Sequence, residues 1–205
     1  MQLINVINGE LEEVFPGRAP PYPILSHVWD GINEVIFQEW ARRDTDEAVR
    51  GKSGYRKIVG ACQQAINDEL GWLWCDTNCI DKTSSAELSE AINSMFAWYK
   101  NFRVCYVYLD DIDIRSIRAI RSSGSTAKGS KKNVEESIPD SVDTEDVHPL
   151  LAKSRWFTRG WTLQELVAPS HEVFFAKDWS ALGDRNQLSR SISDITKIHI
   201  GALRD

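Results

Sequence analysis

Short apolar runs and helix-spaced apolar stripes follow one another along this chain. Residues 22–28, 72–75 and 104–109 are apolar runs of strand length. The run 104–109 has no polar alternation, which is typical of a strand covered on both faces. Between the runs, apolar positions recur at helical spacing over residues 56–70 and from about 84 to 102. This order of elements predicts an α/β fold with an open, mainly parallel sheet and helices on both of its faces.

The second half of the chain adds three elements after a polar stretch. We expect a short helix at 161–168, a strand at 171–176 and a last helix from about 185 to 198. Residues 110–149 are rich in Ser, Gly, Lys, Asp and Glu, basic over 122–132 and acidic over 135–146, and we predict a flexible insertion there. The length of 205 residues favours a single domain over residues 1–205, with residues 185–205 forming its C-terminal helical part.

Charge and composition exclude several classes of function. The formal net charge of -6 argues against nucleic acid as a partner, because polyanion binding depends on clustered Lys and Arg. No apolar run approaches the roughly 20 residues that cross a bilayer, so we expect no membrane span. The four cysteines lie in apolar or strand-like stretches and no leader segment is recognisable. Both features indicate buried thiols in the cytoplasm.

The sequence gives little support for a metal or a prosthetic cofactor. Cys75 and Cys79 are four residues apart, but no second ligand pair follows at zinc-site spacing, and His148 and His171 are not placed to supply one. A Cys79 nucleophile with His27 as its base would require the two residues to meet in space. Walker and GxGxxG motifs are also missing from the sequence. We therefore expect no metal and no prosthetic group.

Polar residues follow the first two predicted strands where each of them ends. Ser26 and His27 close the first strand, and Asp76 and Asp81 flank the loop after the second. The carboxyl ends of parallel strands lie along one edge of a sheet, where open α/β folds bind ligands. The alternative for each residue is a loop-capping or turn hydrogen bond, and for His27 a buried histidine without a catalytic role.

The predicted helix 161–168 carries the most informative carboxylate. Leu163, Leu166 and Val167 fall on one helical stripe that we expect to face the core, whereas Trp161 and Glu165 share the opposite side. This predicts a carboxylate at the edge of the sheet beside an indole.

Two arginines precede this helix, and both are within reach of its carboxylate. Arg155 and Arg159 would either bind an anionic ligand group or pair with Glu165 or Glu172. Helix geometry by itself leaves a solvated glutamate or a surface ion pair open as an alternative.

Three segments of the chain resemble, in order, the signature blocks of the fungal heterokaryon-incompatibility (HET) domain. They are YPILSHVW at 22–29, LWCDTNCIDK at 73–82 and SRWFTRGWTLQELVAP at 154–169. The resemblance spans about residues 22–179. Asp30 and Lys82 depart from the usual pattern, which has glycine and often glutamine at these positions, while the third block is intact.

HET domains are thought to be distant relatives of TIR domains, and the resemblance extends to that pattern. Leu25-Ser26-His27 is similar to the end of the first TIR strand, and the stretch from Ser154 to Leu166 is similar to the TIR segment with a Glu-Leu pair. This relationship implies a flavodoxin-like sheet and places the catalytic glutamate of NAD⁺-cleaving TIR domains at Glu165. NAD⁺ is then the candidate substrate.

The chemistry of NAD⁺ suggests roles for the remaining candidates. Trp29 or Trp161 would stack on nicotinamide or adenine. Arg155 or Arg159 would hold the pyrophosphate. The full set of substrate-binding candidates is Ser26, His27, Trp29, Asp76, Asp81, Arg155, Arg159 and Trp161.

Membership of the family implies a role in fungal cell death, through either of two activities. The first is a TIR-like NAD⁺ glycohydrolase that releases nicotinamide and is triggered by self-association. The second is a non-enzymatic module that oligomerises and acts through partners. In both cases the partners implied are further copies of the chain, a partner protein or other domains of a longer receptor.

Overall fold

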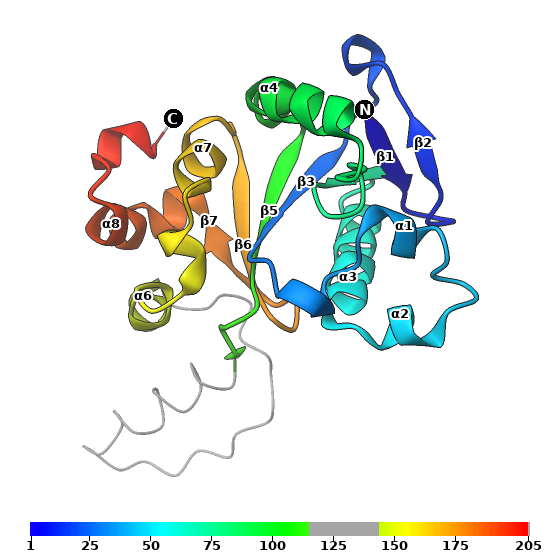
Figure 1. The fold of residues 1–205 in the computed structure, drawn as a ribbon. Helices are drawn as coiled ribbons and strands as arrows, with labels where there is room; N and C mark the ends of the chain where they lie inside the picture. The colour runs from blue at the N-terminus through cyan, green and yellow to red at the C-terminus, as the bar shows by residue number, and fades with distance from the viewer. Residues whose placement is uncertain (115–143, 205) are drawn as a thin grey trace.

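The computed structural model describes residues 1–114 and 144–204 (Figure 1). The strands are β1 (Gln2–Asn5), β2 (Leu11–Glu13), β3 (Pro23–His27), β4 (Trp72–Cys75), β5 (Val104–Leu109), β6 (Glu172–Ala176) and β7 (Ala181–Asp184). The α-helices are α1 (Phe37–Trp40), α2 (Glu47–Gly51), α3 (Ser53–Asn67), α4 (Ser85–Asn101), α6 (Thr144–Leu151), α7 (Thr162–Val167) and α8 (Arg185–Thr196). Short 3-10 turns are η1 (Pro16–Arg18), η2 (Gly31–Asn33), η3 (Arg155–Thr158) and η4 (Ile200–Ala202).

The described strands form one mixed sheet in the order β2-β1-β4-β3-β5-β6-β7. β4, β3, β5 and β6 are parallel to their neighbours and form its centre. β1 pairs antiparallel with β4 and β2, and β7 pairs antiparallel with β6. The α/β fold class is therefore confirmed, whereas the expectation of a mainly parallel sheet holds only for the four central strands.

The register of the central strands assigns their side chains to two faces. Ile24 is paired with Trp74 and Cys105, and Leu25 with Cys75 and Tyr106. Because successive strand residues point to opposite sides, these two sets lie on opposite faces of the sheet.

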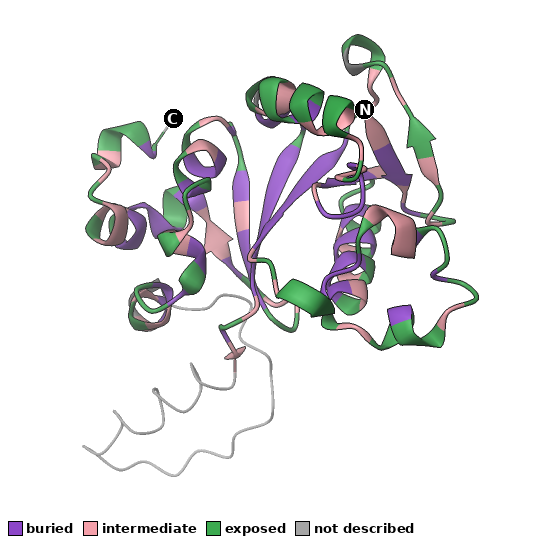
Figure 2. Ribbon diagram, in the orientation of Figure 1, coloured by how far each residue is buried: buried purple, intermediate pink, exposed green. Residues whose placement is uncertain are grey.

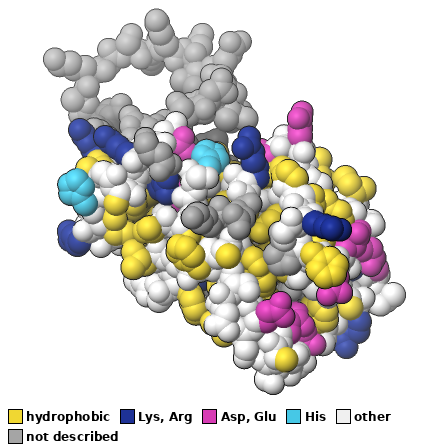
Figure 3. Space-filling view, turned by 90° about the horizontal axis from the view of Figure 1, so that it is seen from above, with side chains coloured by type: hydrophobic (Ala, Val, Ile, Leu, Met, Phe, Trp, Pro, Cys, Tyr) yellow, Lys and Arg dark blue, Asp and Glu magenta, His cyan; other side chains and the backbone are white. Residues whose placement is uncertain are grey.

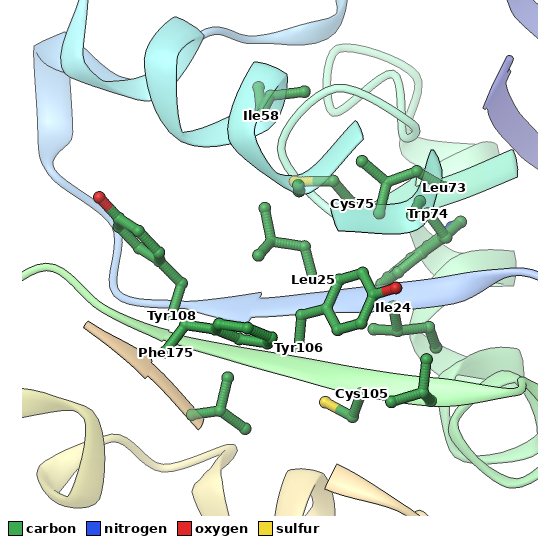
Figure 4. Close-up of a cluster of buried hydrophobic side chains, with 14 of the residues drawn as sticks. Ile24, Leu25, Ile58, Leu73, Trp74, Cys75, Cys105, Tyr106, Tyr108 and Phe175 are labelled. Carbon is green, nitrogen blue, oxygen red and sulfur yellow. The ribbon is translucent and has the colours of Figure 1, made fainter. Parts of the chain in front are cut away.

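The two faces are covered by different helices. On the face of Leu25, Figure 4 shows Cys75 and Ile58 of α3 close by. On the other face, the Trp74 ring packs 5.6 Å from Trp98 of α4. Figure 1 shows α3 and α7 on different sides of the central strands.

The two innermost strands, β3 and β5, are buried along their length, as Figure 2 shows in purple. Every residue of β3 and of β5 is buried. This confirms the expectation that the unbroken apolar run 104–109 is a strand with helices on both faces.

Most predicted helices are present with shifted ends. α3 begins three residues before the predicted start and ends at Asn67, where Asp68 is the C-cap and Glu69 takes a positive φ of 59°. α4 begins after Ser84, whose hydroxyl accepts a hydrogen bond from the Glu87 backbone amide, as expected for an N-cap.

The sequence reading missed the edges of the sheet and misplaced one boundary. The β1–β2 hairpin, β7, α1 and α2 were not predicted, because their apolar stretches are too short to show periodicity. The insertion was expected to run to residue 149, but α6 already begins at Thr144. The basic stretch 122–132 and most of the acidic stretch 135–146 lie outside the described residues. In the described ranges, no helix is both long enough and apolar enough to cross a membrane.

Candidate functional site

Helix α7 is rotated relative to the expected orientation, and this rotation buries Glu165. Thr162, Glu165 and Leu166 form its buried side, with Glu165 5% exposed. Leu163 and Val167 are 60% and 50% exposed, so the prediction that both face the core is wrong. The expectation that Glu165 stays outside the core is wrong for the same reason. A carboxylate tolerates burial only when its oxygens are hydrogen-bonded or paired with a cation, and both conditions are met here.

Ser26 connects the sheet to α7 through two short hydrogen bonds. Its hydroxyl donates to Glu165 Oε2 at 2.7 Å and accepts from the Trp156 indole nitrogen at 2.7 Å. All three side chains are buried. Ser26 lies one position before the end of β3 and, by strand alternation, on the same face as Ile24. The polar end of this strand therefore fixes the position of a carboxylate 139 residues later in the chain.

Arg159 neutralises the same carboxylate through a two-pronged contact. Its Nη1 lies 2.8 Å from Glu165 Oε2 and its Nη2 lies 3.0 Å from Oε1. Arg159 follows the last residue of η3, so its side chain projects back over the first turn of α7. Glu165 thus sits between a neutral donor on the sheet and a guanidinium nearer the surface.

A cleft of about 580 Å³ opens beside Glu165, just beyond the carboxyl ends of β3 and β4. Five of the predicted site residues line it: Trp29, Asp76, Arg159, Trp161 and Glu165. Its size falls within the range of small-molecule sites, and apolar surface with a few convergent polar groups is typical of such sites.

The wall opposite the sheet edge comes from α4 and was missed as part of the site. It consists of Leu88, Ile92, Met95 and Tyr99, which belong to the apolar positions that predicted this helix. Ile92 is almost half exposed. Burial, together with the nearby Glu165 charge, raises the pKa of Tyr99 well above its usual value, so its phenol stays neutral.

Asp76 is at the centre of a second polar group in the cleft wall and contacts Trp29, Lys82 and His27. Its Oδ2 accepts hydrogen bonds from the Trp29 indole nitrogen at 3.1 Å and from Lys82 at 3.2 Å. Lys82 also lies 3.4 Å from the centre of the Trp29 ring, a cation–π distance. Lys82 is a departure from the HET pattern, and it holds Trp29 and Asp76 together.

The other oxygen of Asp76 contacts His27. Its Oδ1 lies 3.2 Å from His27 Nε2. Burial and the charge of Lys57 lower the pKa of His27, but Cys75 and the hydrogen bond to Asp76 raise it, with a net value of about 9. Burial alone would raise the pKa of Asp76, yet its contacts with His27 and Lys82 hold that pKa well below its usual range.

Four of the predicted binding residues do not line the cleft. Asp81 accepts from Thr83 and Gln38, which is the turn-capping alternative. Arg155 pairs with Asp110 at 2.7 Å. His27 is buried and faces Cys75 rather than the cleft. Ser26 is also absent from the cleft surface but reaches it through Glu165.

Taken together, fold and site define an α/β domain with a ligand-sized cleft, whose lining includes a buried, ion-paired carboxylate and two indoles. The comparison with protein families identifies the domain further. Residues 22–165 match the family "Heterokaryon incompatibility protein (HET)", so the chain belongs to the HET family.

One curated relative supports the assignment over a longer stretch. The chain is 41% identical over 188 residues to "Vegetative incompatibility protein HET-E-1" of Podospora anserina. That stretch is 92% of this chain but only 12% of the relative's length. No solved structure matches the chain significantly.

Proposed function

We propose that this chain is the effector domain of a fungal nonself-recognition system and that it kills the cell by cleaving NAD⁺ to nicotinamide and ADP-ribose. The incompatibility role is supported by the HET family match and by the relative from Podospora anserina. Because the chain spans only 12% of that relative, the other segments of such a protein would supply recognition and control.

The observation that carries the enzymatic proposal is the position of Glu165. Its carboxylate is buried and lines a cleft that two indoles, Trp29 and Trp161, also line. In NAD⁺ the nicotinamide leaves as a neutral molecule from a cationic pyridinium, so the reaction requires no acid to protonate it. The developing charge is the oxocarbenium-like ribose, which a desolvated carboxylate stabilises. Water then adds to the ribose carbon and releases a proton.

Arg159 provides a binding step that exposes this carboxylate. Without an anionic ligand its guanidinium is bound to both oxygens of Glu165. A pyrophosphate matches the same guanidinium fork. We propose that the dinucleotide draws Arg159 toward its phosphates and leaves Glu165, still oriented by Ser26, to contact the ribose. Arg155 is not part of this step, because it lies outside the cleft.

The strand order supports the TIR-like, flavodoxin-like fold that the sequence resemblance implies. The parallel strands β4-β3-β5-β6 run 2-1-3-4 when numbered among themselves. This order agrees with the first four strands of the flavodoxin-like pattern, in which ligands bind beyond the carboxyl ends of the strands. The cleft beyond β3 and β4 lies in the corresponding region.

The test is nicotinamide release by concentrated purified protein, wild type against Glu165→Gln. We expect a rate loss of about 100-fold or more, because a neutral amide does not stabilise a developing cation. Glu90→Gln, a substitution of an exposed carboxylate on α4, is the matched control and should keep the wild-type rate. Circular dichroism and thermal unfolding establish that each variant is folded. Equal rates for wild type and Glu165→Gln would refute the catalytic role.

The non-enzymatic module remains a second candidate because of one observation. Four large hydrophobic side chains are exposed on the neighbouring helices α4 and α7: Ile92, Phe96, Leu163 and Val167. Such a surface suits contact with another protein. Cell death caused by wild-type protein without any nicotinamide release, even at high concentration, would favour this second function.

A further inference from the structure

A compact group of potential metal ligands lies behind the cleft, on the α3 face of the sheet. His27 at the end of β3, Cys75 at the end of β4 and Asp76 directly after it bring one ligand atom each within 4.8 Å of the others. The parallel register explains the meeting, since Leu25 pairs with Cys75 and His27 follows Leu25 on the same face. Spacing along the chain gave no sign of this group, because its members come from two strands 48 residues apart.

We infer that His27 Nε2, Cys75 Sγ and Asp76 Oδ1 form a Zn²⁺ site that ties the ends of β3 and β4 together. An imidazole, a thiolate and a carboxylate are three ligand types that Zn²⁺ takes in proteins. One thiolate and one carboxylate balance the charge of the ion.

The two distances from the His27 ring nitrogen suit a tetrahedral ion. His27 Nε2 lies 3.2 Å from Asp76 Oδ1 and 3.7 Å from Cys75 Sγ. Zinc bonds of about 2.0–2.3 Å at tetrahedral angles separate the ligand atoms by about 3.3–3.6 Å. Two of the three ligand separations therefore match the edges of a tetrahedron, and all three ligand atoms lie within 4.8 Å of one another. Water would complete the fourth corner.

The surroundings provide the outer contacts that zinc ligands usually have. Glu34 Oε1 lies 3.7 Å from His27 Nδ1, on the side of the ring away from the proposed ion. Within the described residues, the Nδ1 atom is buried without a hydrogen-bond partner, and Glu34 is the carboxylate that lies nearest to it. A shift of less than about 1 Å would give the carboxylate–histidine–zinc arrangement that fixes the tautomer of a ligand histidine. Thr77 Oγ1 lies 2.8 Å from Cys75 Sγ and is placed to donate to the thiolate.

The two nearby lysines contact oxygens other than the proposed ligand atom of Asp76. Lys57 is paired with Glu34. Lys82 contacts Asp76 through Oδ2, while Oδ1 faces His27. Binding displaces protons from His27 and Cys75, because metal ligands bind in the deprotonated form. The ion would also fix Asp76 in the cleft wall, so this site would hold the cleft in shape whatever reaction takes place there.

The experiment is a Co²⁺ titration of the chelator-treated, full-length chain, followed by absorption spectroscopy. We expect one equivalent to bind with the intense visible bands of tetrahedral Co²⁺ and a thiolate-to-metal charge-transfer band. One equivalent of Zn²⁺ should abolish both, because zinc binds such sites more tightly than cobalt. Failure of wild type to give these bands, or of Zn²⁺ to remove them, would overturn the inference.

Variants assign the signal to its residues. Cys75→Ala should lose the charge-transfer band, and Cys62→Ala, which removes a buried thiol of α3 outside the group, should keep it. If Cys75→Ala does not fold, Asp76→Asn serves instead, because Asp76 is only half-buried. This variant should keep the band but bind Co²⁺ at least tenfold more weakly. An unchanged band in Cys75→Ala, or an unchanged affinity in Asp76→Asn, would refute the site.

Discussion

The side chains of the site are joined by a continuous series of hydrogen bonds that runs from the core to the surface. The buried Trp156 indole donates to Ser26, Ser26 donates to Glu165, and Glu165 accepts from Arg159. The Thr162 hydroxyl holds the first residue of this series in place by donating to the Trp156 carbonyl at 2.6 Å. The carboxylate therefore has a fixed partner on its buried side and a cation on its open side, and only the latter is free to exchange for a ligand.

Removing Arg159 should destabilise the protein far more than removing Arg155. Arg159→Ala leaves the buried carboxylate of Glu165 with Ser26 as its remaining donor, and we expect a loss of about 2–3 kcal/mol in the free energy of unfolding. Arg155 is more than half exposed, so Arg155→Ala should cost less than about 1 kcal/mol. Urea unfolding of both variants measures the difference. Equal losses would show that Arg159 does not stabilise the buried carboxylate.

For single residues, the sequence indicated which side chains belong to the cleft better than it indicated which of them are in contact. Glu165, Trp161 and Asp76 are all predicted site residues, and the structure brings them to one cleft. The contact of Ser26 with Glu165 was beyond reach, because pattern reasoning cannot place residues 139 positions apart within hydrogen-bonding distance. Helix periodicity also gave the wrong side for Glu165, since it ranks apolar residues inside and does not anticipate a paired carboxylate.

Whole elements are positioned by a few buried anchors. Arg185, the first residue of α8, donates to the carbonyls of Leu166 and Pro169 at 3.1 and 2.9 Å and pairs with Glu172 of β6. These contacts satisfy the carboxyl end of α7, whose last carbonyls have no partners within the helix. The helix that carries Glu165 is thus fixed at its first turn by Arg159 and at its last by Arg185.

The start of α3 is held against the η2 segment by a glycine, and this contact can be tested. A Cβ on Gly54 would lie 2.7 Å from the Asn33 carbonyl oxygen and 2.9 Å from Glu34 Cα. Both are backbone atoms, so Gly54→Ala should cost about 1–3 kcal/mol in stability.

Gly51 is the matched control for this substitution, because a Cβ there would meet nothing within 4 Å. Gly51→Ala should be neutral or stabilise by up to about 1 kcal/mol. Thermal unfolding compares the two variants. A Gly54→Ala variant as stable as wild type would mean that α3 and η2 are not in close contact.

Element prediction succeeded where the chain carries long patterns and failed where it does not. The strand 104–109 and the amphipathic helices α3 and α4 were foreseen because burial on one or both faces leaves a readable apolar period. β1, β2 and β7 are only three or four residues long, and each has polar or half-buried positions. Short edge strands are specified by their partners in the sheet, which a linear pattern does not reveal.

At the scale of the whole molecule, β3 links two faces with different chemistry. Ser26 points to the side of α7 and orients the carboxylate of the cleft, while the next residue, His27, points to the side of α3 and the proposed zinc group. Asp76, beyond the sheet edge, contacts both regions. A change in the position of His27 on the α3 face can therefore move Asp76 and alter the cleft wall.

The exposed apolar side chains of α4 and α7 lead to a prediction about association. Figure 3, which views the molecule from above, where α4 lies in Figure 1, shows hydrophobic side chains exposed at several points of that surface. Phe96 of α4 is 56% exposed. Because these helices also form the cleft wall, we expect two copies to associate through them and thereby complete the cleft.

Substitution of Phe96 should weaken self-association without destabilising the fold. Burying one aromatic side chain in each copy contributes about 1.5–3 kcal/mol, so Phe96→Asp should weaken self-association at least tenfold while leaving the thermal unfolding temperature unchanged. Ile32, 87% exposed on η2 and outside this surface, provides the control Ile32→Asp, which should associate like wild type. Sedimentation velocity across a concentration series measures both. The family resemblance implies that NAD⁺ cleavage is triggered by self-association, so we expect the specific activity of wild type to rise with concentration and that of Phe96→Asp to stay low. A wild-type chain that remains monomeric yet fully active would separate the reaction from assembly and assign these hydrophobic residues to a different partner.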